Sequence, residues 1–176
     1  MKIYRISENN LSNVATLMSE ICPTWWDYDG AVKQLSDVES MIGTVGWSIG
    51  EDEKAPKGWV LCRELFGYNS IELECCGYDD NGKFALEHKL RELFDVICEY
   101  AKSKGYITFR TAMGSEKFSI HDRKLGDIGD EIKNLTATGR VDYDWLLEYG
   151  FKVVGIFPNA YRENFHCISL AKDLRI

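Results

Sequence analysis

This sequence lacks the marks of several large protein classes. No stretch approaches the ~18 consecutive apolar residues that a membrane-spanning helix needs, so we expect no membrane partner. The opening residues, MKIYRISENN, have no apolar run after their charge, which predicts that there is no signal peptide. There is also no P-loop, no Gly-x-Ser-x-Gly motif and no dinucleotide-binding glycine motif. The familiar nucleotide and serine-nucleophile signatures therefore give no lead to function.

Metal-binding patterns are missing too. None of the six cysteines forms a C-x-x-C pair, and the three histidines have no metal-ligand spacing with cysteine or with one another. Most cysteines lie in apolar patterns, where thiols behave as small hydrophobes. A redox pair at Cys75 and Cys76 is disfavoured because a disulfide between adjacent residues is strained. These observations predict no metal site and reduced thiols in a cytoplasmic protein.

Positive charge is scarce. Lysine and arginine number 21 against 28 aspartates and glutamates, which gives a net charge of −7. A protein that binds phosphate backbones normally has a basic face, so nucleic acid is not an expected partner. An acidic surface suits a cationic small substrate, but it equally serves solubility.

What is present is an ordinary globular composition of 176 residues, 45% apolar and 28% charged, enough for one domain or one domain with an insertion. Apolar spacing predicts helices over 11–21, from 29 to about 42, over about 86–104 and over 145–149. Strands are predicted at 2–6, 43–50, 57–65, 70–76, 106–111, 151–157 and 166–171. The order is β-α-α-β-β-β-α-β-α-β-β, an α/β (α+β) chain. Its early and late strands should be antiparallel, and one parallel crossover should join 70–76 to 106–111.

Two segments interrupt this order. Residues 113–140 have little periodicity, four glycines and many charges, which predicts a long loop or a small helical insertion over one end of the sheet. Within it, His121-Asp122 fits either a substrate contact or a loop turn. Trp25 and Trp26 join the first two helices, and adjacent side chains cannot both face one core. One of them should therefore line a groove or a lid, unless both simply pack.

The central stretch, 70–106, reads as a buried strand, a polar turn over 79–83 and an amphipathic helix that Gly105 ends. Its apolar stripe comprises Leu86, Leu90, Leu93, Phe94, Ile97 and Ala101. A strand that enters a helix through a short polar loop points the first free N–H groups of the helix at the loop. We therefore expect an anion site there.

Two stretches resemble the GNAT superfamily of acyl-CoA-dependent N-acetyltransferases: ICEYAKSKGY at 97–106 and WLLEYGFKVVGIF at 145–157, followed by a strand ending in LAKDL. The element order resembles that family over nearly the whole chain. The resemblance implies a single domain over 1–176, with a loop insertion at 113–140 and a mixed, mostly antiparallel sheet. It also implies acetyl-CoA as co-substrate, an amine of a small molecule or peptide as acceptor, and direct attack of that amine on the thioester.

The resemblance assigns the pyrophosphate to the strand-to-helix loop. The family pattern is Gln or Arg, then any two residues, Gly, any one residue, and Gly or Ala. It fits residues 80–85 best. Only Ala85 matches there, while Asp80 and Lys83 replace the basic residue and the central glycine. A later alignment places Leu86, His88 and Leu90 on these positions. The expected acyl-CoA contacts are Cys75, Cys76, Gly77, Tyr78, Asn81, Gly82, Lys83, Phe84 and Ala85.

The transfer chemistry implies three further roles. A backbone N–H near Cys75 or Cys76 would polarise the thioester carbonyl. Glu72 or Glu74 would take the proton of the amine, unless both are exposed or paired with a lysine or arginine. The family's tyrosine acid falls on Leu146, so Tyr143 is the candidate here and Tyr149 the alternative.

A second reading keeps the fold and drops the reaction. The poor match of the phosphate loop and the missing tyrosine also fit a catalytically degenerate GNAT-fold protein that serves as a binding or interaction module. In either case a homodimer through sheet edges or the late strands is common in the fold.

Overall fold

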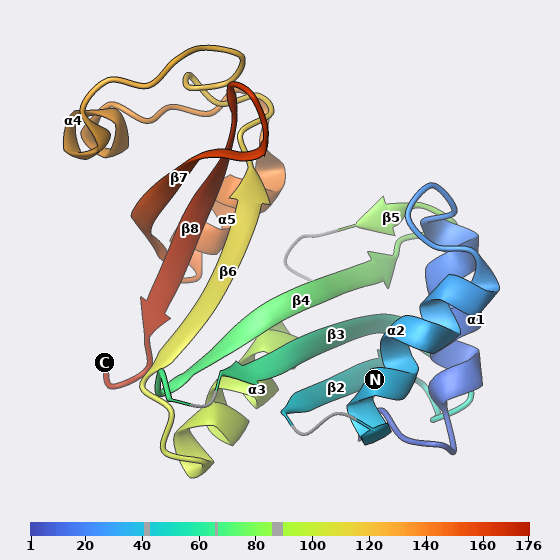
Figure 1. The fold of residues 1–176 in the computed structure, drawn as a ribbon. Helices are drawn as coiled ribbons and strands as arrows, with labels where there is room; N and C mark the ends of the chain where they lie inside the picture. Colours follow the sequence, from blue (N-terminus) through green and yellow to red (C-terminus); the bar gives the residue numbers. More distant parts are fainter. Residues whose placement is uncertain (41–42, 66, 86–89) are drawn as a thin grey trace. The chain divides into compact units, whose positions relative to one another are not determined.

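The computed structural model describes residues 1–40, 43–65, 67–85 and 90–176 (Figure 1). The chain divides into two compact units, Met1–Tyr106 and Ile107–Ile176. Each unit is described by itself.

The first unit is built on an antiparallel sheet. Its strands are β1 (Lys2–Arg5), β2 (Thr44–Gly50), β3 (Pro56–Leu65) and β4 (Ser70–Asp79), each paired with the next, and a short β5 (Phe84–Ala85) pairs with the end of β4. β2 and the middle of β3 are buried, as expected of strands covered on both faces.

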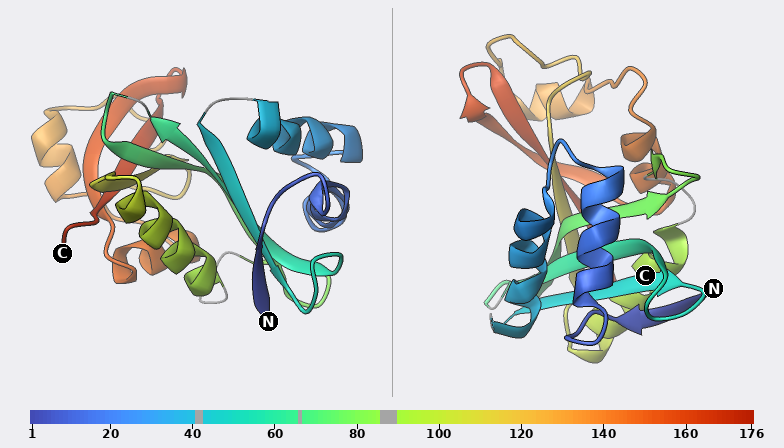
Figure 2. Two further views of the ribbon diagram at one scale, coloured as in Figure 1. Left: turned by 90° about the horizontal axis from the view of Figure 1, so that it is seen from below. Right: turned by 90° about the vertical axis from the view of Figure 1, so that its right-hand side faces the viewer.

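Helices cover both faces of this sheet. α1 (Leu11–Ile21) and α2 (Tyr28–Ser40) lie on one face, and α3 (Arg91–Ser103) lies on the other (Figure 2). The predicted stripe of α1 is buried and packs with Trp59 of β3, as does Leu35 of α2. α3 buries Leu93, Phe94, Ile97 and Ala101 and ends before Gly105, whose φ of 82° is the left-handed conformation of a helix end.

The second unit has a three-stranded antiparallel sheet. β8 (Phe165–Asp173) lies between β6 (Thr108–Gly114) and β7 (Lys152–Arg162). Two short helices, α4 (Ile128–Lys133) and α5 (Val141–Glu148), occur between β6 and β7. The core contains Phe109, Trp145, Phe151, Ile168 and Leu170.

The predicted α+β class, its mostly antiparallel sheet and its element order are confirmed, with β5 and α4 added to the order. Ile42 and Leu86, assigned to the stripes of the second and third helices, lie outside the described residues. Segment 113–140 continues β6 to Gly114, contains α4, and is joined across by an isolated bridge between Phe118 and Ala137. The predicted parallel pairing of 70–76 with 106–111 stays a prediction, as does the single domain over 1–176.

Two local predictions are wrong. The turn at 79–83 does not lead straight into a helix, because β4 runs on to Asp79 and turns back as β5. α5 begins earlier than the predicted 145–149, at Val141 with Arg140 as N-cap, so Asp142 and Asp144 lie in its first turn. Within the part of the chain described, no helix has both the length and the apolar character needed to span a membrane.

Candidate functional site

The end of β4 carries most of the residues that the sequence singled out. Leu61 of β3 pairs with Cys75, but the next residue, Cys62, pairs with Leu73, so Glu74 is an extra residue in β4. A bulge of this kind bends the strand, interrupts the hydrogen-bond ladder and redirects side chains, and bulges often lie beside functional sites. The predicted carbonyl-polarising backbone at Cys75 and Cys76 therefore follows directly on an irregularity in the strand.

Of the two candidate bases, Glu74 has a cationic partner. Arg63 of β3 stands opposite Glu72 in the ladder, and its Nη2 lies 3.1 Å from Oε1 of Glu74. The Arg63 side chain is 55% exposed, so the ion pair contributes at most about 1 kcal/mol and exchanges readily with water. The sequence left open whether these glutamates are paired with a lysine or arginine, and Glu74 is paired with Arg63.

The thiols near the bulge are poor nucleophiles. Burial raises the pKa of Cys75 to about 12, although a hydrogen bond with Trp59 opposes the shift. Burial, with smaller contributions from Cys76, Cys75 and Glu74, raises the pKa of Cys62 well above its ordinary value. All six cysteines lie among the described residues and are free thiols. Protonated thiols do not attack acyl groups, so Cys75 offers no covalent route on this strand.

The polar turn after β4 is a closed hairpin turn. Asn81 and Gly82 have φ values of 56° and 80°, as a two-residue hairpin loop of the primed type requires. The backbone N–H of Asp80 donates to the carbonyl of Lys83 at 2.8 Å, and that of Lys83 donates back to Asp80 at 3.3 Å. The N–H of Gly82 donates to Oδ1 of Asp79 at 2.6 Å.

These three N–H groups are used inside the turn and are not directed at an anion. The anion site expected at this turn therefore has no free N–H group from Asp80, Gly82 or Lys83, although the side chain of Lys83 is exposed there. Phe84 and Ala85 follow in β5, and α3 begins only at Arg91, after an N-cap residue, Leu90, that makes no side-chain capping bond.

The later alignment of the phosphate-loop pattern, on Leu86, His88 and Leu90, ends at the N-terminus of α3. It places its last position on Leu90, which is fully buried at the N-cap of α3. Leu86 and His88, its other two positions, lie outside the described residues.

The two rings of the Trp25-Trp26 joint contact each other edge-on, with centroids 5.6 Å apart, but differ in burial. Trp26 packs edge-on against Trp59 with ring centroids 6.2 Å apart, whereas Trp25 is 62% exposed. Asp27 caps α2 by accepting from the N–H of Gly30 at 2.7 Å. Exposed Tyr28 lies at the start of the helix, so the joint displays aromatic rings beside carboxylates, with Trp26 as the anchor.

The tyrosine candidates lie in the second unit. Tyr143 of α5 is 8% exposed and packs edge-on against Phe118, with centroids 4.9 Å apart. Burial and the charge of Asp144 raise its pKa, so its hydroxyl is protonated at neutral pH. Tyr149 stacks on Trp145 at 5.4 Å and lies 4.7 Å below the Lys172 ammonium. Both tyrosine rings are packed against neighbouring side chains. Leu146, which stands at the position of the family's tyrosine, is also buried.

The loop after β6 contains a hydrogen-bonded chain that the sequence did not suggest. Ser115 Oγ accepts from the N–H of His166 at 3.1 Å and is hydrogen-bonded to Nδ1 of His121 at 3.1 Å. Nε2 of His121 lies 3.2 Å from Oδ2 of Asp122, which has a φ of 53°. Ser115 is fully buried, so no substrate reaches its oxygen. The chain of bonds therefore orders a loop turn and is not a serine nucleophile. Among the residues that the structure describes, no three His, Cys, Asp or Glu side chains are placed to hold a metal ion.

Solved structures of other proteins are similar to this chain over nearly its full length. An aminoglycoside 6'-N-acetyltransferase in complex with coenzyme A superposes with a TM-score of 0.82 at 16% identity, covering 99% of this chain and 97% of that one. The aminoglycoside 6'-N-acetyltransferase from Enterococcus faecium gives a TM-score of 0.78 at 16% identity, with the same coverage of 99% and 97%. The ribosomal-protein-S18-alanine N-acetyltransferase from Escherichia coli gives 0.66 at 10% identity, covering 98% and 93%.

The chain has the GNAT fold. At sequence level no protein-family model matches it, and no curated protein matches it. The expected resemblance is thus confirmed as a likeness of fold to GNAT acetyltransferases at 10–16% identity, which makes this a divergent GNAT-fold chain. The functional roles predicted for residues of β4, for the 79–83 turn and for Tyr143 stay predictions.

Proposed function

We propose that this protein is an N-acetyltransferase that moves an acetyl group from acetyl-CoA to an amine of a small molecule or peptide. The observation that carries the proposal is the match over 99% of the chain, at a TM-score of 0.82, to an acetyltransferase crystallised with coenzyme A. The bulge in β4 at Glu74 supports it, because it interrupts the ladder beside the backbone proposed to bind the thioester.

The residues of β4 fit the acyl end of this substrate. In the proposed reaction a backbone N–H at Cys75 or Cys76 stabilises the oxyanion that forms when the amine attacks the thioester carbon. Glu72 or Glu74 takes the proton that the amine nitrogen loses as the C–N bond forms. The C–S bond then breaks, and the CoA thiolate takes up a proton from the solvent. The products are the N-acetylated amine and CoA.

The phosphate end fits less well. The N–H groups of Asp80, Gly82 and Lys83 form hydrogen bonds within the 79–83 turn. The contribution of this turn to phosphate binding is therefore the exposed ammonium group of Lys83, in a turn that also contains Asp79 and Asp80. Lys57 already pairs with Asp79 at 3.2 Å and offsets one of these charges. The proposal therefore assigns Asn81, Gly82, Lys83, Phe84 and Ala85 to contacts that flank the pyrophosphate.

The acceptor is proposed to be a cationic amine. Trp25 and Tyr28 are exposed rings whose neighbours in sequence include Asp27 and Asp29, and ammonium groups bind well to aromatic faces beside carboxylates. The net charge of −7 adds a general attraction for cations.

The experiment is a transfer assay that follows release of the CoA thiol. The panel contains diamines, polyamines, multiply charged amino sugars and a peptide with a free N-terminus, and mass spectrometry identifies the acetylated product. Glu72→Gln and Glu74→Gln are tested beside the natural protein, with Glu51→Gln as a control in an exposed turn. Acetylation that one β4 variant loses and the control keeps supports the proposal.

A second candidate, a catalytically degenerate GNAT-fold binding module, is favoured by the closed 79–83 turn. It predicts that no amine releases thiol and that Lys83→Glu alters no nucleotide-linked behaviour. If the acetyltransferase proposal is right, Lys83→Glu weakens binding of CoA about two- to fivefold, the effect of one exposed charge on a phosphate.

A further inference from the structure

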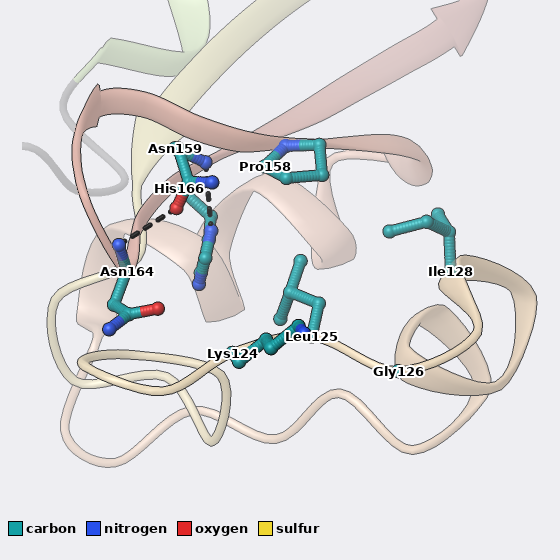
Figure 3. A pocket seen from close by; sticks show the side chains of 8 residues that line it. All are labelled: Lys124, Leu125, Gly126, Ile128, Pro158, Asn159, Asn164 and His166. Atoms are coloured by element: carbon teal, nitrogen blue, oxygen red, sulfur yellow. Dashed lines mark hydrogen bonds between the residues drawn. The ribbon is translucent and has the colours of Figure 1, made fainter.

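The second unit contains a pocket that has no part in the transfer chemistry above. Its cavity volume is about 290 Å³, and all its lining residues lie between β6 and the end of the β7–β8 hairpin (Figure 3). Eight residues line it: Lys124, Leu125, Gly126, Ile128, Pro158, Asn159, Asn164 and His166. A volume of this size is at the lower end for small-molecule sites.

The pocket is held open by a buried histidine. His166 is 1% exposed, and its Nδ1 accepts from the N–H of Asn159 at 3.0 Å. Nε2 therefore carries the proton and donates to the carbonyl of Arg123 at 2.9 Å. The N–H of Asp122 also donates to the carbonyl of Asn164, at 3.0 Å. The loop wall and the hairpin wall are thus tied together at two places, and the space between them is preformed.

The lining carries one positive charge and no negative one. Lys124 is the charged residue among the eight, because His166 is neutral in the bonding just described. Two nearby carboxylates are already engaged. Glu131 accepts from Arg123 at 2.8 and 2.6 Å and from the N–H of Gly126 at 2.9 Å. Asp127 accepts from the N–H of Asp130 at 3.1 Å. In a chain of net charge −7, this pocket favours an anion.

The other lining residues set the rest of the ligand. Leu125, Ile128 and Pro158 provide an apolar surface on one side, whereas Asn159 and Asn164 provide amides on the other (Figure 3). An amino acid does not suit this lining, because its ammonium group would find no carboxylate among the eight residues.

We propose that this pocket binds a small aliphatic monocarboxylate, with its carboxylate at Lys124 and Asn164 and its chain against Leu125, Ile128 and Pro158. A charge-assisted hydrogen bond to lysine supplies the polar contact, and burial of a few methylene groups supplies the remainder. A ligand of about six non-hydrogen atoms then binds with a dissociation constant in the millimolar range. The proposal does not depend on the acetyltransferase activity.

The test is a titration of the isotope-labelled full chain followed by NMR amide shifts. Butanoate is the probe, and butanol and butylammonium are neutral and cationic controls of similar length. We expect butanoate to shift the signals of 124–128 and 158–166 in a saturable way, butanol to bind about tenfold more weakly, and butylammonium not to bind there.

Lys124→Gln should weaken butanoate binding about tenfold, whereas Lys133→Gln, which removes an exposed lysine of α4 that does not line the pocket, should leave it unchanged. The amide spectrum of each variant shows whether its fold is kept. Equal binding of butanoate and butanol, equal binding by the Lys124 variant, or no saturable shift in these two segments would overturn the proposal.

Discussion

The tie between the loop after β6 and the β7–β8 hairpin depends on His166, and replacing this residue tests that conclusion. His166→Phe keeps a planar ring in a buried position but removes both ring nitrogens. The N–H of Asn159 and the carbonyl of Arg123 then lose their partners. His166→Asn offers an oxygen near the place of Nδ1, so it can keep the first bond and lose the second.

The expected magnitude follows from these two bonds. A buried polar group left without a partner costs about 1–3 kcal/mol, and the exposed loop lets water relieve part of the cost at Arg123. The free energy of unfolding should therefore fall by about 2–4 kcal/mol in the Phe variant. The Asn variant should lose about half as much, since it keeps one of the two bonds.

Denaturant unfolding gives the free energies, and amide hydrogen exchange of Asn159 gives the local result. Exchange at Asn159 should be slow in the natural protein, slow in the Asn variant and fast in the Phe variant. A Phe variant within about 0.5 kcal/mol of the natural protein, with slow exchange at Asn159, would refute the assigned bonds and the neutral form of His166.

Three further predictions concern both units. Trp25→Ala should change the free energy of unfolding by less than about 0.5 kcal/mol, because the ring is 62% exposed, but it should raise the KM for the amine. Trp26→Ala, which removes the ring packed on Trp59, should lower the free energy of unfolding measured with denaturant by about 2 kcal/mol. Of Glu72→Gln and Glu74→Gln, the one that removes the base should lower kcat about 10²- to 10⁴-fold at unchanged KM for acetyl-CoA, as steady-state kinetics would show. The side-chain hydrogen bond from Arg123 and the backbone hydrogen bond from Gly126 lower the pKa of Glu131 from 4.5 to about 2. The contribution of the Glu131 carboxylate to stability should therefore be complete above about pH 4.5 and be lost as the pH falls toward 2. An NMR titration of the Glu131 carboxyl with a midpoint near pH 4.5 would contradict this prediction.

Most of the fold follows from local periodicity. The apolar spacing of α1 and α3 and the strand-like runs of β2 and β3 place these elements within a few residues of their observed ends. α4 is only six residues long and buries none of them, so no stripe marks it in the sequence. Asp127, with Asp130 three residues later, was its one local signal.

The hairpin at β5 could have been predicted. Asn81-Gly82 between two strand-like runs is a strong two-residue hairpin signal, and the expectation of a helix directly after the turn obscured it. The bulge at Glu74 has no comparable signal, since an extra residue in a strand depends on the register of its partner, β3.

The site was harder to predict than the fold. The candidates on β4 were chosen by strand period and family resemblance, and these do not report the ion pair of Glu74 with Arg63. The role of His166 depends on two partners that are 7 and 43 residues away in sequence. Contacts at such separations are set by tertiary packing, which no short sequence pattern records.

The measurement that tests the account most directly is calorimetric titration of the protein with acetyl-CoA, CoA and adenosine 3′,5′-bisphosphate. The account predicts micromolar binding of acetyl-CoA and CoA, with the bisphosphate fragment clearly weaker because it lacks the pantetheine arm that would lie along β4. Absence of binding at millimolar acetyl-CoA would contradict the acetyltransferase proposal and leave the GNAT fold here as a scaffold for another ligand.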